Sequence, residues 1–328
     1  MPRWFRPALA CAAWLTATTA LAQSAPLVQL IQPPAPPAPP AAATPVAPVT
    51  VQAPLSPAEL KEQAVSFVRS YAASTVRLDQ IARWREPICA QIGGLKPVEA
   101  YQVQARLEEV AKAAGARMLA PGCAANVDIW FTEEPQVLLD RIAARQEEAL
   151  GYFHSSDTKA LKTVTRPIQA WYMTATTGSG GPNAGAMFAN VGGARYDSEV
   201  VDDPESLAPK GCGDSRFSAC QQSVFKHVLV VVDSGRVQGH SRALVSDYVA
   251  MLVLAQARSL EGCKVLPSVT DLFSACPGRT APDSLTPADA AYLAALYAAN
   301  LEAKKAGEQS DIAERMAKIL IKANPVAR

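Results

Sequence analysis

The chain has 328 residues, of which 49% are hydrophobic and 19% charged, and its formal net charge is +1 at pH 7. This length is enough for a folded domain with a sizeable hydrophobic core. A nearly neutral chain without a dense run of lysine and arginine is a poor nucleic-acid binder, so we expect no nucleic-acid partner.

The first 22 residues have the features of a secretory signal peptide. A short basic region precedes an apolar stretch over 8–21, and small residues end the segment at Ala22. This pattern predicts export to the periplasm or the exterior, with residues 1–22 removed. A lipoprotein signal that ends at Cys11 is the alternative, although it leaves almost no hydrophobic run ahead of the cysteine. No later stretch reaches about 18 apolar residues without polar interruption, so we predict no transmembrane segment in the mature chain.

A proline-rich linker follows over residues 23–57 and is densest between Pro33 and Pro40. Because proline fixes φ and lacks an amide donor, the linker favours an extended polyproline II conformation over a packed core. Three interpretations stay open: a disordered leader, a semi-rigid stalk, and a Pro-x-x-Pro ligand for a partner. Residues 58–328 are then expected to form one domain.

Cysteine usage agrees with export. Six cysteines remain after the signal peptide: Cys89, Cys123, Cys212, Cys220, Cys263 and Cys276. An even number in an exported chain predicts three disulfides. Of the 15 pairings that six cysteines allow, we expect the local ones, which are Cys89–Cys123, Cys212–Cys220 and Cys263–Cys276. The cysteines lack the clustered Cys-x-x-Cys spacing of a zinc site, so we predict neither a metal nor another cofactor.

Hydrophobic periodicity and capping residues predict helices and strands in the first half of the domain. The expected elements are a helix that begins at Ser56-Pro57, a basic and partly extended segment over 78–89 that ends in a strand leading to Cys89, a helix over 97–114, a strand over 127–131 and a helix over 132–150. The strand is predicted because Val127, Ile129 and Phe131 alternate with Asp128 and Trp130.

The second half is expected to contain two strands separated by a long loop, followed by helices. The ranges are a strand over 168–173, a loop over 174–222, a strand over 228–232, an apolar helix over 242–260, a short packed segment over 266–273, a helix from Thr286-Pro287 and a last helix from Ser310-Asp311. The continuous apolar run over 228–232 predicts a strand that is buried on both faces. On the last helix we expect the inward positions to be Ile312, Met316, Ile319 and Leu320. The predicted fold class is therefore α+β, a single exported domain stapled by three disulfides.

Residues 225–300 resemble the catalytic half of zincin-type metallopeptidases. The resemblance consists of a buried strand, a long apolar helix, the segment Ser-Val-x-Asp-Leu-Phe at 268–273, and the pattern Leu-Thr-Pro-x-Asp…Leu-x-x-Leu-Tyr at 285–297. The last pattern is similar to one in secreted bacterial zincin-like proteins of unknown function. The resemblance implies a degenerate zincin-like fold. The alternative is that an apolar helix beside an apolar strand is simply hydrophobic core.

The resemblance also implies that the metal site of such a fold is missing. In active zincins the helix carries His-Glu-x-x-His, because residues four apart on one helix face can bind Zn²⁺ together. The corresponding turn here reads Ser-Asp-Tyr-Val-Ala over 246–250. Neither histidine position holds histidine, and the glutamate position holds Asp247.

Asp247 is the principal candidate for a functional side chain, because it stands among apolar residues and a buried carboxylate needs partners. One interpretation is a site carboxylate near Tyr248 or His240. The other is a structural anchor that accepts hydrogen bonds from neighbouring backbone or from an arginine. Four aromatic residues also allow two interpretations, because they could line a ligand-binding groove or pack in the hydrophobic core: Trp84, Trp130, Trp171 and Tyr172.

These patterns favour a non-catalytic binding or structural module that is exported to the cell envelope, with an envelope protein or polymer as its partner. The alternative is a peptidase-like hydrolase with an unrecognised site near Asp247 and His240.

Overall fold

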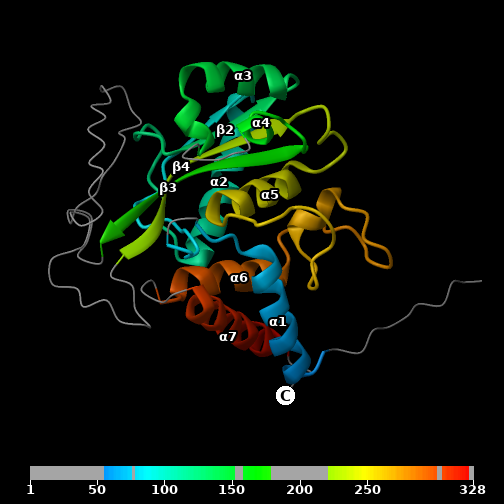
Figure 1. The fold of residues 1–328 in the computed structure, drawn as a ribbon. Helices are drawn as coiled ribbons and strands as arrows, with labels where there is room; N and C mark the ends of the chain where they lie inside the picture. The colour runs from blue at the N-terminus through cyan, green and yellow to red at the C-terminus, as the bar shows by residue number, and fades with distance from the viewer. Residues whose placement is uncertain (1–54, 76–77, 152–157, 179–220, 301–304, 325–328) are drawn as a thin grey trace, which may run out of the picture. The chain divides into compact units, whose positions relative to one another are not determined.

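The computed structural model describes residues 55–75, 78–151, 158–178, 221–300 and 305–324. The predicted signal peptide, almost all of the predicted linker and the expected Cys212–Cys220 pair lie outside these residues. Within them the chain folds as an α+β domain built on a mixed four-stranded sheet, as the sequence predicts (Figure 1). None of the helices in these ranges is long and apolar enough to cross a membrane.

The helices of the described ranges are α1 (Pro57–Tyr71), α2 (Pro97–Ala114), α3 (Pro135–Arg145), α4 (Thr158–Leu161), α5 (Arg242–Leu254), α6 (Pro287–Ala298) and α7 (Lys305–Ala323), with 3₁₀ turns η1 (Glu147–Leu150) and η2 (Val269–Phe273). The strands are β1 (Ala90–Gly93), β2 (Val127–Thr132), β3 (Ile168–Gly178) and β4 (Gln221–Asp233).

The sheet has the strand order β1-β2-β4-β3. Strands β1, β2 and β4 run parallel, with Ala90 opposite Val127 and Val127 opposite Val228. Strand β3 runs antiparallel to β4, and their register shifts between Met173 and Thr174, which marks a β-bulge. Strand β4 is therefore an interior strand, which agrees with its uninterrupted apolar run.

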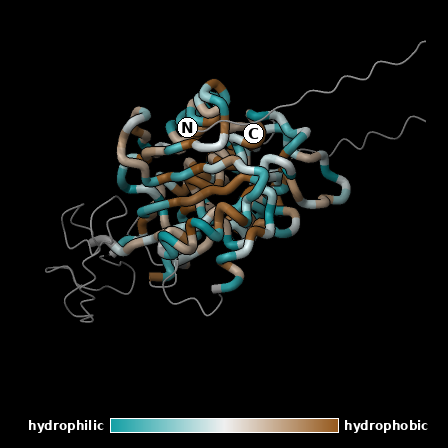
Figure 2. Tube along the Cα trace, turned by 90° about the horizontal axis from the view of Figure 1, so that it is seen from above, coloured by the Kyte–Doolittle hydropathy of each residue, from teal (hydrophilic) through white to brown (hydrophobic). Residues whose placement is uncertain are grey.

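Side chains of β4 alternate between two hydrophobic clusters. Val228, Val230 and Val232 belong to the larger cluster with α1, α2, α5, α6 and α7. Leu229 and Val231 belong to a smaller cluster that α3 and η1 cover on the other face. Figure 1 shows α3 on one side of the sheet and α2 and α5 on the other, with α6, α7 and α1 farther from the sheet on that second side. Figure 2 shows the hydrophobic stretches gathered in the interior of the domain.

Local capping explains where several helices begin. Ser56 and Glu59 form a capping box at the start of α1, and Thr286 and Asp289 form another at the start of α6, each with proline at the first helical position. Helix α2 ends at Gly115, whose φ of 91° lies in the left-handed region that favours glycine. These three helices agree with the sequence-based ranges.

Two of the three expected disulfides are confirmed. Cys89 is bonded to Cys123, and Cys263 is bonded to Cys276. The first joins the residue before β1 to the turn that leads to β2, and the second closes a loop that contains η2. Each disulfide therefore connects segments that are close in the sequence.

Three predicted helices had wrong boundaries. The helix expected over 132–150 is α3, which ends at Arg145 and is followed by the separate turn η1. The helix expected over 242–260 ends at Leu254, since the following backbone bonds to the end of α1: Arg258 N–H donates to the Tyr71 carbonyl, and Ala73 N–H donates to the Gln256 carbonyl. The last helix begins at Lys305 rather than at Ser310, and Ile319 on it is 39% exposed instead of facing inward.

Strand positions also needed correction. The strand near the first disulfide follows Cys89 instead of leading to it, because the residues after Cys89 pair with β2. The loop expected over 174–222 is shorter at both ends, since β3 continues to Gly178 and β4 begins at Gln221. Thr174 and its neighbours pair with β4 even though their sequence has no apolar alternation.

The close approach of two strand ends makes Gly94 a sensitive position. Its φ is 81°, and a Cβ there would overlap the carbonyl oxygen of Phe131. Gly122 has a similar φ of 93°, but a Cβ there meets no atom of the described chain within 4 Å. We predict that Gly94→Ala lowers the free energy of unfolding by more than about 4 kcal/mol, whereas Gly122→Ala costs about 1 kcal/mol, the penalty for the backbone conformation alone. Equal losses in urea denaturation would contradict this assignment.

Candidate functional site

Helix α5 is the element that the zincin resemblance singles out. It follows β4, as that resemblance requires, and η2 and α6 come after it. Every residue from Leu244 to Leu254 is buried, so the helix has no face toward solvent along this length. At the two positions where an active zincin has histidine, Ser246 donates its hydroxyl to the Arg242 carbonyl, and Ala250 is fully buried.

Asp247 on α5 is 1% exposed, and both of its carboxylate oxygens accept hydrogen bonds. The Arg106 side chain of α2 donates Nε–H to Oδ1 at 2.6 Å, and the Leu285 backbone donates N–H to Oδ2 at 2.7 Å. Arg106 also pairs with Glu109 on α2. Asp247 thereby connects α5 to α2 and to the residues just before α6.

The other two candidates, His240 and Tyr248, both pack against Phe273 instead of Arg106 and Leu285, the partners of Asp247. The rings of His240 and Tyr248 lie 5.5 Å and 5.4 Å from that of Phe273 at the end of η2. His240 is exposed, whereas Tyr248 is buried, and burial raises the pKa of the Tyr248 phenol well above its usual value. The structure thus places both rings against Phe273, while the Asp247 carboxylate bonds to α2 and Leu285.

The aromatic candidates act mainly as core residues that bond to backbone carbonyls. Trp84 and Trp171 are buried, and their indole N–H groups donate to the carbonyls of Val253 and Leu161. The Tyr172 hydroxyl donates to the Leu252 carbonyl near the end of α5. Trp130 is half-buried and packs against the smaller cluster. Such pairing is what a buried indole or phenol requires.

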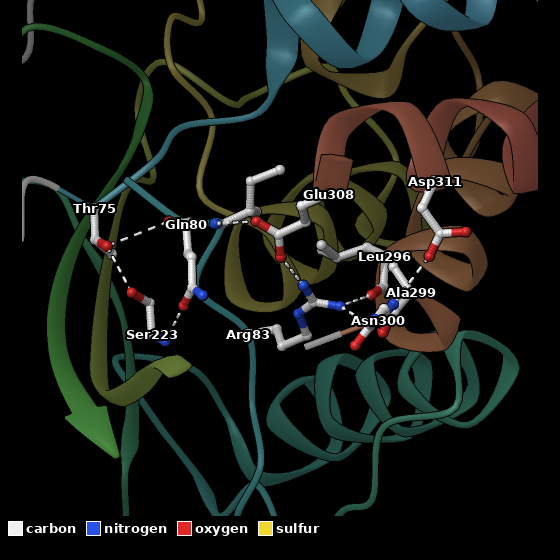
Figure 3. Close-up of polar contacts among 10 residues, drawn as sticks. Thr75, Gln80, Arg83, Ser223, Leu296, Ala299, Asn300, Glu308 and Asp311 are labelled. Atoms are coloured by element: carbon white, nitrogen blue, oxygen red, sulfur yellow. Dashed lines mark hydrogen bonds and ion pairs between the residues drawn. The ribbon is translucent and has the colours of Figure 1, made fainter. Parts of the chain in front are cut away.

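A polar junction that sequence reasoning missed lies around Arg83 (Figure 3). Arg83 is 2% exposed, and its guanidinium donates from Nη2 to Glu308 at the start of α7. Its Nη1 donates to the carbonyls of Leu296 and Ala299 at the end of α6. The other oxygen of Glu308 accepts a 2.8 Å bond from the backbone N–H of Ile81. The pair therefore joins the segment before Trp84 to both C-terminal helices.

Burial acts against the charged form of both partners in this pair. It lowers the pKa of the Arg83 guanidinium and raises the pKa of the Glu308 carboxyl, although each partner's charge opposes the shift of the other. Desolvation of two ions is expensive, so the hydrogen bonds made by Nη1 and Nη2 of Arg83 and by both oxygens of Glu308 are needed to hold the pair in the core. The buried Nε of Arg83 has no hydrogen-bond partner among the described residues.

The same segment also bonds to the sheet. The Arg83 carbonyl accepts from the Phe225 backbone N–H on β4. The Gln80 side-chain oxygen accepts a 3.0 Å bond from the Ser223 N–H, and the Ser223 and Thr75 hydroxyls lie 2.6 Å apart (Figure 3). Residues 80–83 therefore connect β4 on one side with α6 and α7 on the other.

Asp289 forms a second buried carboxylate anchor at the start of α6. It is fully buried and accepts from the Ser268 hydroxyl, the Val269 N–H, and both the hydroxyl and the N–H of Thr286. Desolvation is the largest influence on this group and raises its pKa to about 6, against the lowering effect of the four hydrogen bonds. Asp289 thereby connects η2 to the first turn of α6.

A histidine–carboxylate pair lies on the face of the sheet that carries the smaller hydrophobic cluster. His227 on β4 is 4% exposed, and its Nε2 lies 3.0 Å from an Asp128 carboxylate oxygen on β2. Its buried Nδ1 has no hydrogen-bond partner among the described residues. The ring joins two neighbouring strands, and substrate could not reach an atom buried in this way without local opening.

In the part of the chain that the structure describes, no three histidine, cysteine, aspartate or glutamate side chains are grouped so as to hold a metal ion. Comparison with protein-family models, with curated proteins and with solved structures finds no match for the chain. The hydrogen bonds of the described polar clusters connect elements of the fold: those of Asp247 and Asp289 around α6, and those of Arg83 and Glu308 between the sheet and α7.

Loss of the Glu308 charge should be strongly destabilising. We predict that Glu308→Gln lowers the free energy of unfolding by about 3–5 kcal/mol, because it leaves the buried Arg83 guanidinium without a counter-ion. Glu314 on the same helix pairs with Lys318 at the surface, so Glu314→Gln is the matched control and should leave the free energy of unfolding nearly unchanged. Denaturant titration of both variants measures the difference, and equal losses would show that the buried pair does not stabilise the fold.

The raised pKa of Asp289 predicts how stability depends on pH. The native carboxyl, with a pKa of about 6, binds a proton more tightly than the unfolded one, whose ordinary value is 3.8. The native state therefore binds more protons between these pH values. The free energy of unfolding should then fall by about 3 kcal/mol as pH rises from about 4 to about 6. The Asn side chain of the Asp289→Asn variant cannot titrate. The free energy of unfolding of this variant should therefore change less between about pH 4 and pH 6 than that of the wild type, whatever its value at either pH. Identical pH profiles for the two proteins would contradict the assignment.

Proposed function

We propose that this chain is an exported envelope protein that works as a binding or structural module and not as an enzyme. The observation that carries the proposal is the environment of α5, the helix that the zincin resemblance identifies with a catalytic helix. Its residues are buried from Leu244 to Leu254, and Asp247 uses both carboxylate oxygens for structural hydrogen bonds. A catalytic group must reach substrate, and this carboxylate is bonded within the core.

Export is supported by the signal-peptide pattern and by the two disulfides. Stable disulfides persist in oxidising compartments and are rare where thiols are kept reduced. Cys89–Cys123 and Cys263–Cys276 are both consistent with such a compartment. We extend the proposal to a third pair, Cys212–Cys220, and to a periplasmic or extracellular location. The proline-rich linker would then space the domain from the structure to which it is attached.

A degenerate zincin-like scaffold is the second part of the proposal. It is supported by the chain order β4, α5, η2 and α6, which matches the order of the resembling segments in the sequence. Ser246 and Ala250 stand where the metal ligands would be, and neither supplies a zinc ligand. Hydrogen bonds to Asp247 and Asp289 connect these elements in the protein.

Asp247 should then be a stability residue. We predict that Asp247→Asn lowers the melting temperature by several degrees, because the half-buried Arg106 loses its negatively charged partner. Asp283 is an exposed carboxylate two residues before Leu285, and Asp283→Asn should leave the melting temperature within about a degree. Calorimetry on the purified mature proteins measures both values. An unchanged melt for Asp247→Asn, with loss of a measured activity, would reverse the assignment in favour of a catalytic role.

The rival function is a peptidase-like hydrolase with His240 and Asp247 at its site. The exposed position of His240 beside Phe273 is the observation in its favour. Elemental analysis of the purified mature protein, together with hydrolysis of a casein and peptide panel, separates the two functions. We expect sub-stoichiometric zinc and no hydrolysis above a buffer blank. Hydrolysis that is lost in His240→Ala, or stoichiometric zinc whose removal abolishes hydrolysis, would overturn the non-enzymatic proposal.

The binding part of the proposal has its own test, which is co-sedimentation of the purified mature protein with isolated peptidoglycan. Retention that is lost on thermal unfolding would support an envelope polymer as partner. If the protein does not sediment with peptidoglycan, the polymer is excluded as its partner and the proposed partner becomes an envelope protein. Crosslinking in intact cells would identify that protein.

A further inference from the structure

The two described disulfides differ in how solvent can reach them. Cys89 is 2% exposed and directly precedes β1, while its partner Cys123 is half-buried. Cys263 is exposed, and Cys276 is half-buried. Thiol–disulfide exchange requires direct access of a thiolate to one sulfur, so the two bonds should differ in reactivity toward external thiols.

The loop closed by Cys263–Cys276 is also closed by non-covalent bonds. Arg279 donates from Nη1 to the Lys264 carbonyl and from Nη2 to the Val265 carbonyl. These two bonds join nearly the same ends of the loop as the disulfide does. Within the loop, Asp271 accepts from the backbone N–H groups of Lys264 and Ser268. None of these bonds involves a cysteine side chain, so we expect them to persist when the disulfide is broken.

The inner side of this loop is anchored in the core independently of its cysteines. Leu266, Val269 and Leu272 are buried in the larger cluster, and Asp289 binds the backbone of η2 through Val269. Burial of these three aliphatic side chains stabilises the position of the loop through the hydrophobic effect. The domain should therefore retain its fold when only this disulfide is reduced.

We propose that Cys263–Cys276 is a reversible thiol–disulfide exchange site in the folded protein, whereas Cys89–Cys123 is a structural disulfide that is protected by burial. The co-reactant is a dithiol, either a small molecule or the active-site dithiol of an exported oxidoreductase. Its thiolate attacks Sγ of the exposed Cys263, the Cys263–Cys276 bond breaks, and Cys276 leaves as a thiolate that takes up a proton.

The second thiol of the co-reactant completes the exchange. Its thiolate attacks the sulfur of the co-reactant in the mixed disulfide, so that Cys263 leaves as a thiolate and is protonated. The protein gains two electrons and two protons, and the dithiol is oxidised to a disulfide. The reduced protein then carries a surface thiol at Cys263 on a loop that Arg279 still closes.

Differential alkylation of the full mature protein tests the proposal. Samples are incubated with dithiothreitol for increasing times, quenched with N-ethylmaleimide and mapped by mass spectrometry, and circular dichroism is recorded in parallel. We expect Cys263 and Cys276 to become alkylated at least about ten-fold faster than Cys89 and Cys123, with unchanged secondary structure. Equal rates for both pairs, or reduction of Cys263–Cys276 only with loss of the circular dichroism signal, would overturn it.

Two further measurements test the attacked sulfur and the role of Arg279. Brief exposure to glutathione near neutral pH, followed by an acid quench, should leave the glutathionyl group on Cys263, and a majority on Cys276 would contradict the assigned direction of attack. In the Arg279→Ala variant, the reduced protein should be cleaved by trypsin after Lys264, the tryptic site that the variant shares with wild type in this loop, at least about five-fold faster than the oxidised variant. Wild-type protein should show a smaller difference, because Arg279 closes the loop in both redox states; an equal difference would remove Arg279 from the proposal.

Discussion

The burial of Arg83 is the constraint on which the arrangement of sheet and helices depends. A guanidinium in the core needs a counter-ion, because an unpaired buried charge costs several kcal/mol. Glu308 supplies the charge, and the carbonyls at the end of α6 accept further bonds. Since the Arg83 carbonyl also accepts a hydrogen bond from β4, one residue determines how α6 and α7 lie relative to the sheet.

Carboxylates have a similar role around α5 and α6. Asp247 receives bonds from α2 and from the backbone before α6, and Asp289 receives bonds from η2 and from its own helix start. Both are almost completely buried. The segment that resembles the catalytic half of a zincin is therefore held together by hydrogen bonds to carboxylates, and its apolar helix serves as the centre of the core. This arrangement is the physical basis of the non-enzymatic proposal.

The two disulfides complement these polar anchors in different ways. Cys89–Cys123 joins the residue before β1 to the turn that leads to β2, and its Cys89 sulfur belongs to a buried residue. Cys263–Cys276 lies at the surface on a loop whose inner side is already bound to the core. A covalent bond that duplicates non-covalent closure can be opened without unfolding the domain, which is why the proposed exchange chemistry is assigned to the second pair.

Sequence by itself determined the features that depend on neighbours in the chain. The capping boxes at Ser56 and Thr286, the glycine that ends α2, the alternation in β2, and the pairing of nearby cysteines all arise from residues a few positions apart or within one short segment. Only the tertiary structure decided where α5 ends, how far β3 and β4 pair, and which groups form hydrogen bonds with Asp247. Arg83 and Glu308 are 225 positions apart, and Asp247 and Arg106 are 141 apart. Partners at such separations leave no periodic pattern, so their pairing emerges only when the chain folds.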